Sequence, residues 1–256
     1  MKLPFQRTAT AAAPSASLAE FPPIDGAEIS GMVHGIRVGG DFYHFMRTTR
    51  RRVVFGLLDV AGQRSENQSI IAAAKSAFQS IAAEKLANED VNEADAMMEF
   101  SMELNAAIRR SAANICVCAA FLGCYSEDIG TICYVNAGHT PGLLRHGNEI
   151  HELRATGLPL GLFAASTYEA PIIVVAPGSS LLLVSRGVVE AIRRKEEFGL
   201  QRVKEHFAGV PLDHANVIAS SVLDAVRQHL GSAPAGNDLT TLALVRRESR
   251  DPAPAG

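Results

Sequence analysis

One stretch constrains the fold of this chain more than any other: residues 38–62, with the sequence VGGDFYHFMRTTRRRVVFGLLDVAG. Two short apolar runs flank a basic turn at residues 47–52, and each run carries one acid beside small residues, Asp41 after Gly40 and Asp59 before Gly62. The β-branched and aromatic residues of both runs are typical of paired, buried strands. If the runs pair as a hairpin, the two carboxylates converge at one end of a sheet.

Converging carboxylates at a sheet edge predict a site for a hard cation, because Mg²⁺ and Mn²⁺ prefer oxygen ligands. Gly62 would let the backbone turn closely past such a site. A plainer interpretation competes with this one, since Gly-Gly-Asp and Asp-x-x-Gly also occur in ordinary turns. The stretch by itself therefore predicts a buried hairpin and leaves the cation site open.

The whole chain has 256 residues, enough for one large domain or two small ones, and nothing in it marks an interdomain linker. Apolar residues make up 47% and charged residues 20%, so a sizeable core can be buried. The formal net charge of −3 argues against a nucleic-acid or anionic-membrane partner held by bulk electrostatics. No apolar run approaches the roughly 18–20 residues of a membrane helix.

The ends of the chain and its cysteines complete this outline. Residues 1–20 are rich in Ala, Ser and Thr without a continuous apolar core, which predicts a disordered tail rather than a signal peptide, and residues 249–256 form a second predicted tail. One domain is expected over residues 21–248.

The four cysteines are Cys116, Cys118, Cys124 and Cys133, and they lack the spacing of zinc ligands. We therefore expect buried, reduced thiols and a cytoplasmic protein.

The remaining pattern predicts an α+β fold. Runs of strands and runs of helices follow one another without strict alternation, which indicates antiparallel sheets. We expect strands at 27–38, 116–125, 131–139, 141–152, 168–175, 180–185 and 239–245. We expect two helices within 65–110, and further helices at 188–194, 200–207 and 215–230.

Six sequence blocks then suggest a family. In chain order they are VGGDFYHF (38–45), LLDVAGQ (57–63), YVNAGHTPGLL (134–144), GLPLGL (157–162), LLLVSRGVVEA (181–191) and NDLTTLALV (237–245). Any single block is a weak signal, but the NAGH block and the ordered set together are specific and cover nearly all of residues 20–248. The chain resembles the PPM-type metal-dependent serine/threonine phosphatases, in the bacterial branch named after the stage II sporulation protein E.

The resemblance implies an antiparallel β-sandwich flanked by helices, in four layers α-β-β-α, with metals at one edge. It implies hydrolysis of phosphoserine or phosphothreonine, commonly on anti-sigma-factor antagonist proteins, by a water bridging two Mn²⁺ or Mg²⁺ ions. Asp59 would be the bridging ligand, the Val60 carbonyl its neighbour on the first metal, and Asp41 an acid that binds the same ion or stands behind its ligands. Asp41 and Asp59 are thus the expected catalytic residues. The expected partner is a phosphorylated regulatory protein, and a homodimer is compatible with the sequence.

The chain departs from the family pattern at the second metal. Arg186 stands before Gly187 where the family has Asp, and Asn237 replaces the first Asp of the last block. Asn237 retains a carbonyl oxygen, but a neutral ligand holds a hard cation less tightly. Asp238 is a further candidate ligand, although neighbouring residues on a strand point to opposite faces. The Arg186 guanidinium can instead fill the vacated space and pair with Asp59, so one cation is expected and the second is doubtful.

Structural interpretations compete at several of these positions. Arg186 can be a solvated surface charge and Asn237 a turn cap, and His44, which replaces a later Asp of the first block, can be a satisfied core histidine. His139 of the NAGH block is expected to fix a turn by hydrogen bonding. Gly40, Gly62 and Gly187 are expected to shape the backbone beside the site.

Two functions follow from the sequence. The first is a phosphatase that keeps one metal, and the second is a pseudophosphatase that binds a phosphoprotein without turnover. Asp41, Asp59 and Gly62 favour the enzyme, whereas Arg186 and Asn237 favour the binding module. A zinc or nucleotide enzyme of another class lacks motif support, since the chain has no P-loop, GxGxxG or HExxH sequence.

Overall fold

The structure is a computed structural model that describes residues 23–34, 40–62, 64–112 and 116–248. The tails predicted at 1–20 and 249–256 lie outside the described residues. Within the described ranges, no helix is long and apolar enough to cross a membrane.

Two antiparallel sheets of five strands each form the centre of the molecule. The first sheet has the order β2-β3-β4-β5-β8, with bounds Asp41–Arg47, Arg52–Val60, Cys118–Ser126, Thr131–Ala137 and Ile172–Val174. The second sheet has the order β1-β12-β9-β6-β7, with bounds Ala27–His34, Leu239–Arg246, Ser180–Val184, Gly142–His146 and Glu149–Leu153.

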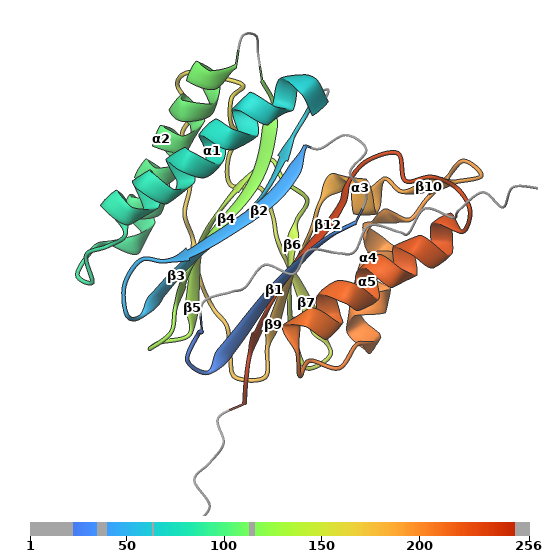
Figure 1. Ribbon diagram of the computed structural model, residues 1–256. Helices are drawn as coiled ribbons and strands as arrows, with labels where there is room; N and C mark the ends of the chain where they lie inside the picture. The colour runs from blue at the N-terminus through green and yellow to red at the C-terminus, as the bar shows by residue number, and fades with distance from the viewer. Residues whose placement is uncertain (1–22, 35–39, 63, 113–115, 249–256) are drawn as a thin grey trace, which may run out of the picture.

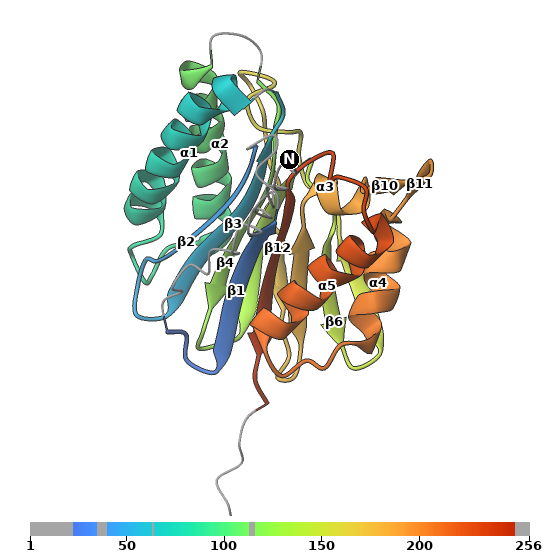
Figure 2. The same cartoon turned by 45° about the vertical axis from the view of Figure 1, so that its right-hand side comes forward.

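Helices cover the outer face of each sheet (Figures 1 and 2). The pair α1 (Arg64–Lys85) and α2 (Glu93–Ser111) packs on the first sheet, and the pair α4 (Gly199–Gly209) and α5 (Ala215–Leu230) packs on the second. The layers therefore run helices, sheet, sheet, helices. This arrangement confirms the predicted α+β fold with its four layers.

The hairpin predicted over residues 38–62 is present as β2 and β3. These strands pair antiparallel over their whole length, from Arg47 opposite Val53 to Asp41 opposite Asp59. Strand β3 is buried at every position because it lies between β2 and β4, with the α1–α2 pair on one face and the second sheet on the other. The two acids of the sequence thus lie at the same edge of the first sheet, as the pattern predicted.

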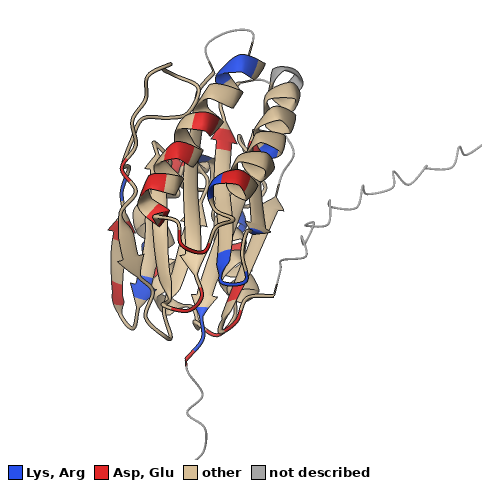
Figure 3. Cartoon of the chain, turned by 90° about the vertical axis from the view of Figure 1, so that its left-hand side faces the viewer, with Lys and Arg blue, Asp and Glu red and all other residues tan. Residues whose placement is uncertain are grey.

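Side-chain contacts mark the start of α2 and the end of α1. Asn92 caps α2, because its side chain accepts hydrogen bonds from two backbone N–H groups of the first turn. Acidic residues follow one another along α2 on the outer face of the molecule (Figure 3). Lys85 at the end of α1 lies 3.2 Å from Glu99 and 2.8 Å from Glu103, so the two helices are also joined by ion pairs.

A buried ion pair fastens this helical pair to the first sheet. Nε of Arg52, the first residue of β3, lies 2.6 Å from Oε1 of Glu93 at the start of α2, and both side chains are 11% exposed. The same guanidinium donates to the carbonyls of Asn88 and Glu89 between the helices. Ser126 at the end of β4 donates to Glu93 as well. Each of the three nitrogens of the Arg52 guanidinium therefore has a hydrogen-bond partner in a largely dry position.

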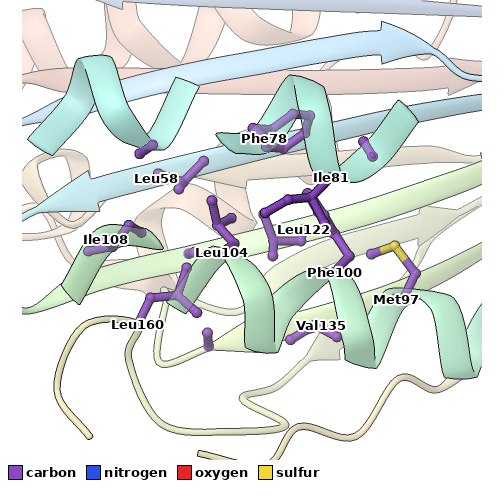
Figure 4. Close-up of a cluster of buried hydrophobic side chains, with 14 of the residues drawn as sticks. Leu58, Phe78, Ile81, Met97, Phe100, Leu104, Ile108, Leu122, Val135 and Leu160 are labelled. Atoms are coloured by element: carbon purple, nitrogen blue, oxygen red, sulfur yellow. The ribbon is translucent and has the colours of Figure 1, made fainter. Parts of the chain in front are cut away.

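Three apolar clusters make up the core. The cluster between α1–α2 and the first sheet contains Phe78, Met97, Phe100, Leu104 and Leu122 (Figure 4). A second cluster fills the space between the two sheets, and a third lies under α4 and α5. Along β3, Val54 and Leu58 face the helices while Phe55 and Leu57 face the other sheet, which is the two-residue alternation of a strand.

The four cysteines are free and buried, as predicted. Burial raises the pKa of Cys133 to about 12, so this thiol stays protonated and inert at neutral pH.

The helix predicted at 188–194 is wrong. Only one helical turn, α3 (Arg186–Val189), is present, and a short hairpin of β10 (Ile192–Arg193) and β11 (Glu196–Glu197) follows it. The apolar spacing that suggested a helix does not form one buried face, because Ile192 is 53% exposed. The turn residues Arg194 and Lys195 have φ of 52° and 71°, a left-handed conformation that costs a non-glycine residue about 1 kcal/mol.

One predicted strand is shorter than expected, and another can be followed only in part. The strand predicted at 168–175 is present only as β8, because Pro171 precedes it and has no N–H to donate to a neighbouring strand. The strand predicted at 27–38 is present as β1 over residues 27–34, and residues 35–38 lie outside the described residues.

Replacing Arg52 by methionine is expected to lower the free energy of unfolding by about 3–5 kcal/mol, because Glu93 would keep a buried charge without its partner. Chemical denaturation followed by circular dichroism measures the loss. Adding Glu93→Gln to Arg52→Met is expected to recover part of it, since the buried charge is then removed. A loss below about 1 kcal/mol, the range of an exposed pair, would contradict this assignment.

Candidate metal and catalytic site

A small pocket of about 120 Å³ lies where β2 begins, β3 ends, α3 begins and the chain enters β12. It is the end of the sandwich at which α3 is drawn in Figures 1 and 2. Nine of the ten residues that the sequence singled out for the site line this pocket, and His139 does not. The lining is Gly40, Asp41, Asp59, Val60, Ala61, Gly62, Arg186, Gly187, Asn237 and Asp238.

Asp41, at the start of β2, is a partly buried acid of the pocket. Its Oδ2 has no hydrogen-bond partner among the described residues, although it lies away from water. The pKa of Asp41 is raised to about 7, chiefly by burial and then by the charge of Asp59, against a smaller lowering by the hydroxyl groups of Ser185 and Thr240. A buried carboxylate oxygen without a donor is an unfavourable arrangement that a proton or a cation would relieve.

Asp59 lies opposite Asp41 and contacts Arg186. Nε of Arg186 is 3.4 Å from Oδ2 of Asp59 and 3.9 Å from Oε2 of Glu190. Burial raises the pKa of Asp59, the guanidinium of Arg186 lowers it, and the charge of Glu190 raises it. The distance exceeds the roughly 2.7–2.9 Å of a charge-assisted hydrogen bond, and the Arg186 side chain is 52% exposed. The pair is therefore solvated and weak.

Asp238 holds the two sheets together at the pocket. Its Oδ2 accepts a hydrogen bond of 2.9 Å from the backbone N–H of Gly40, although the residues are 198 positions apart in the chain. Gly40 packs closely against the end of β3, where only a residue without a side chain fits, because a Cβ there would lie 2.4 Å from the Val60 carbonyl oxygen. The contact that the structure shows for Asp238 is thus a positioning one, and its role as a metal ligand stays a prediction.

Gly187 allows α3 to pack against the segment before β12. A Cβ at this position would lie 2.0 Å from the carbonyl oxygen of Asp238 and 3.0 Å from Cβ of Asn237. Any other residue would push Arg186 and Asn237 apart. The predicted structural role of Gly187 therefore has a physical basis in this close approach.

Two residues of the site were missed by the sequence analysis. Asn67 of α1 is buried, and its Nδ2 donates a hydrogen bond of 3.0 Å to the Val60 carbonyl, which is the predicted ligand. Ser185 accepts a hydrogen bond from the N–H of Thr240 at 3.1 Å beside Asp41. The available sequence signal for Asn67 was a polar residue at the start of an apolar helical stripe. Nothing in the sequence distinguished Ser185 from other residues that follow a strand.

The two histidines considered for the site lie outside the pocket lining. His44 faces α1, with its ring 5.1 Å from the ring of Phe78. His139 lies in the turn after β5, where its N–H donates to Oδ1 of Asn136 at 2.8 Å and its Nδ1 is 3.1 Å from the Thr140 carbonyl. Thr140 in turn donates to the Val184 carbonyl of the other sheet. These are the turn-fixing hydrogen bonds expected for His139.

The pocket offers a small set of oxygen donors that suits a hard cation. Among the described residues, no group of three or more His, Cys, Asp or Glu side chains could hold a metal ion. The donors that remain are the carboxylates of Asp41 and Asp59 and the Val60 carbonyl, and Mg²⁺ accepts such a small set because it keeps several waters. The unpartnered Oδ2 of Asp41 fits this arrangement. A second ion beside it would meet the positive charge of Arg186 and the neutral amide of Asn237.

Replacing His139 by glutamine is expected to remove part of the acid sensitivity of folding. Burial lowers the pKa of His139 to about 4, against 6.5 for an exposed histidine. Its contribution to stability is therefore complete above pH 6.5 and is lost as the pH falls toward 4. The parent should lose about 3 kcal/mol relative to the variant over this range in denaturation experiments. The surface variant His146→Gln is the control, and equal pH profiles of the parent and His139→Gln would contradict the prediction.

Comparison with known proteins agrees with this geometry. Residues 49–247 match the family model described as stage II sporulation protein E (SpoIIE). Protein IcfG of Synechocystis sp. is 31% identical over 133 residues, which make up 49% of this chain and 20% of that protein. The chain thus spans about a fifth of the length of this curated relative.

Solved structures share the fold. The RsbU and RsbW domains of Rv1364c from Mycobacterium tuberculosis superpose with a TM-score of 0.71 at 20% identity, over 87% of this chain and 62% of that chain. The SiaA-PP2C domain of Pseudomonas aeruginosa also superposes with a TM-score of 0.71 at 20% identity, over 86% of this chain and 85% of that chain. Identity at this level shows the fold, and the family model, which covers most of the chain, shows the family. The chain belongs to the stage II sporulation protein E family of PPM-type phosphatase domains.

Proposed function

We propose that this chain is a protein phosphatase domain that removes phosphate from phosphoserine or phosphothreonine on a regulatory protein by means of metal-activated water. One observation carries the proposal: Asp41 and Asp59 lie opposite each other at the pocket, and Oδ2 of Asp41 is buried without a partner. An oxygen in this position is a ligand for a hard cation. Family membership supports the same chemistry.

The residues of the pocket have distinct tasks in this proposal. A bound Mn²⁺ or Mg²⁺ would acidify a water and neutralise charge on the phosphoryl oxygens. Asp59 and the Val60 carbonyl would bind the cation. Asn67 orients that carbonyl by donating a hydrogen bond to it. Asp41, whose unpartnered Oδ2 lies in the same pocket, would add a second carboxylate to the ligands of the cation.

Arg186 has a task that the family pattern does not assign to this position. Its half-exposed guanidinium lies at the pocket, and its contact with Asp59 is weak. It can therefore turn toward the phosphoryl oxygens, which a guanidinium binds through two parallel hydrogen bonds. In this role Arg186 supplies positive charge where the second metal ion is missing.

The proposed partner is a phosphorylated regulatory protein, such as an anti-sigma-factor antagonist. This assignment is supported by the family and by the exposed position of Arg186 at the pocket.

A second candidate is a binding module that recognises a phosphoprotein without turnover. The contact of 3.4 Å between Arg186 and Asp59 favours it, because the arginine occupies the position of a ligand and neutralises the acid expected to hold the metal. Asn237 favours it too, since both changes affect the same ion. The two candidates differ in one measurable property, which is hydrolysis.

Mn²⁺-dependent hydrolysis of an aryl phosphate tests the proposal. We expect turnover by the parent and a loss of about 100-fold or more in Asp59→Asn, because the cation would lose its central ligand. Asp128→Asn, which changes an exposed acid outside the pocket, is the matched control and should keep the parent's rate.

The double variant Arg186→Asp with Asn237→Asp separates the two candidates. Turnover in this variant with none in the parent would contradict the phosphatase proposal and support the binding module. Turnover in the parent that survives in Asp59→Asn would contradict the assigned site.

A further inference from the structure

The β10–β11 hairpin carries two cations at the positions of its turn. Its strands pair Ile192 with Glu197 and Arg193 with Glu196, so Arg194 and Lys195 form a two-residue turn. Both residues have positive φ, and turns of this kind favour Asn-Gly because those residues adopt the conformation easily. Packing does not offset the backbone strain of Arg194 and Lys195, because the whole hairpin is exposed to solvent. What the turn presents to solvent is therefore the two long, charged side chains.

The base of this hairpin is fixed to the body of the protein. Nη1 of Arg193 donates to the carbonyl of His229 at the end of α5, and Nε2 of His229 lies 3.2 Å from the carbonyl of Glu196. Nη1 of Arg202 in α4 donates to the carbonyl of Glu197 at 2.7 Å. The tip differs from the base, because neither Arg194 nor Lys195 has an ion-pair or hydrogen-bond partner in the described part of the chain. The hairpin is thus an anchored support for two unpaired cations.

The hairpin begins beside the pocket. Arg186 and Glu190, whose charges act on Asp59, belong to the turn of α3 and the residue after it, and Ile192 follows two residues later. Figures 1 and 2 show the hairpin projecting from the body at the same end as α3. From Ala191 to the tip at Lys195 the chain spans at most about 14 Å, which is also the reach of about four extended residues. The tip is therefore within reach of the residues that flank a phosphate bound at the pocket, a few positions along the peptide.

We propose that this basic hairpin, residues 192–197, binds acidic side chains that flank the phosphoserine or phosphothreonine of a protein substrate. The inference rests on the proposed function, because the pocket must receive the phosphate. Arg194 and Lys195 supply charge-assisted hydrogen bonds to carboxylates. Ile192, which is 53% exposed, supplies an apolar contact beside them.

Charge favours a protein segment over an anionic membrane. Recognition of anionic lipid surfaces requires clusters of about four to eight cations, whereas the tip offers two. Glu190, Asp59, Asp41 and Asp238 lie at the adjacent pocket and would repel an extended negative surface. A narrow acidic segment of a protein can contact the tip without lying over these acids.

The test compares peptide binding by the parent, Arg194→Asn with Lys195→Gly, and the control Arg194→Lys with Lys195→Arg. The first variant removes both cations and installs the residues that the turn favours, so it should fold and its Tm should rise by a few degrees. The control keeps both charges. The probes are fluorescein-labelled peptides with a central phosphoserine and either glutamate or alanine at the third to fifth positions on both sides. Anisotropy is measured in EDTA, so that hydrolysis plays no part.

We expect the parent and the control to bind the glutamate peptide about tenfold more tightly than the alanine peptide. The Asn-Gly variant should lose this preference despite its higher Tm. Equal affinities for the two peptides in the parent, no binding of either, or an unchanged preference in the Asn-Gly variant would each overturn the inference. So would binding of the parent to phosphatidylserine vesicles with no preference between the peptides.

Hydrolysis of an aryl phosphate separates this inference from the proposed function. An aryl phosphate has no flanking residues, so all three proteins should hydrolyse it at the same rate. A retained peptide preference without turnover would contradict the proposed catalysis and support the peptide-binding role of the hairpin. Normal turnover without any peptide preference would mean the reverse.

Discussion

The pairing of β2 with β3 is the constraint on which the site depends. It places Asp41 directly opposite Asp59 at the edge of a sheet that is buried on both faces. Two carboxylates so placed repel each other and have lost most of their water, and the raised pKa of Asp41 expresses that cost. The rest of the fold holds them there, because β3 is buried along its whole length and cannot slip by one residue without reversing its faces.

The second sheet contributes the parts that decide what the acids can do. Asp238 reaches across to the N–H of Gly40, and Arg186 reaches to Asp59. The first contact is buried and short, whereas the second is exposed and long. The pocket therefore combines a rigid connection between the sheets with a movable cation, and this difference favours an arginine that responds to a ligand over one that seals the site.

The sequence was informative where local pattern determines position. Asp41 and Asp59 each lie six residues from the pair Arg47–Val53 that closes the turn, so antiparallel pairing alone brings them together. The sequence blocks supplied Asn237, Asp238 and Arg186, although no local pattern could place them beside β3. Asn67 and Ser185 were missed because their contacts arise only when α1 and β12 pack against the pocket. The β10–β11 hairpin was mistaken for a helix because Arg194-Lys195 carries no Asn or Gly to signal a turn, while Val188, Ala191 and Ile192 imitate a helical spacing.

The order of strands in the second sheet has a consequence for how the protein is made. Strand β12 lies between β1 and β9, and its register pairs Ala27 with Arg246, so this pairing joins segments from nearly opposite ends of the described chain. During synthesis, β1 and β9 both remain open edges until residues 239–246 have left the ribosome. Asn237 and Asp238 emerge in the same interval. Closure of the second sheet and the hydrogen bond of Asp238 to Gly40, which joins the two sheets at the pocket, therefore depend on one segment of the chain and form in one event.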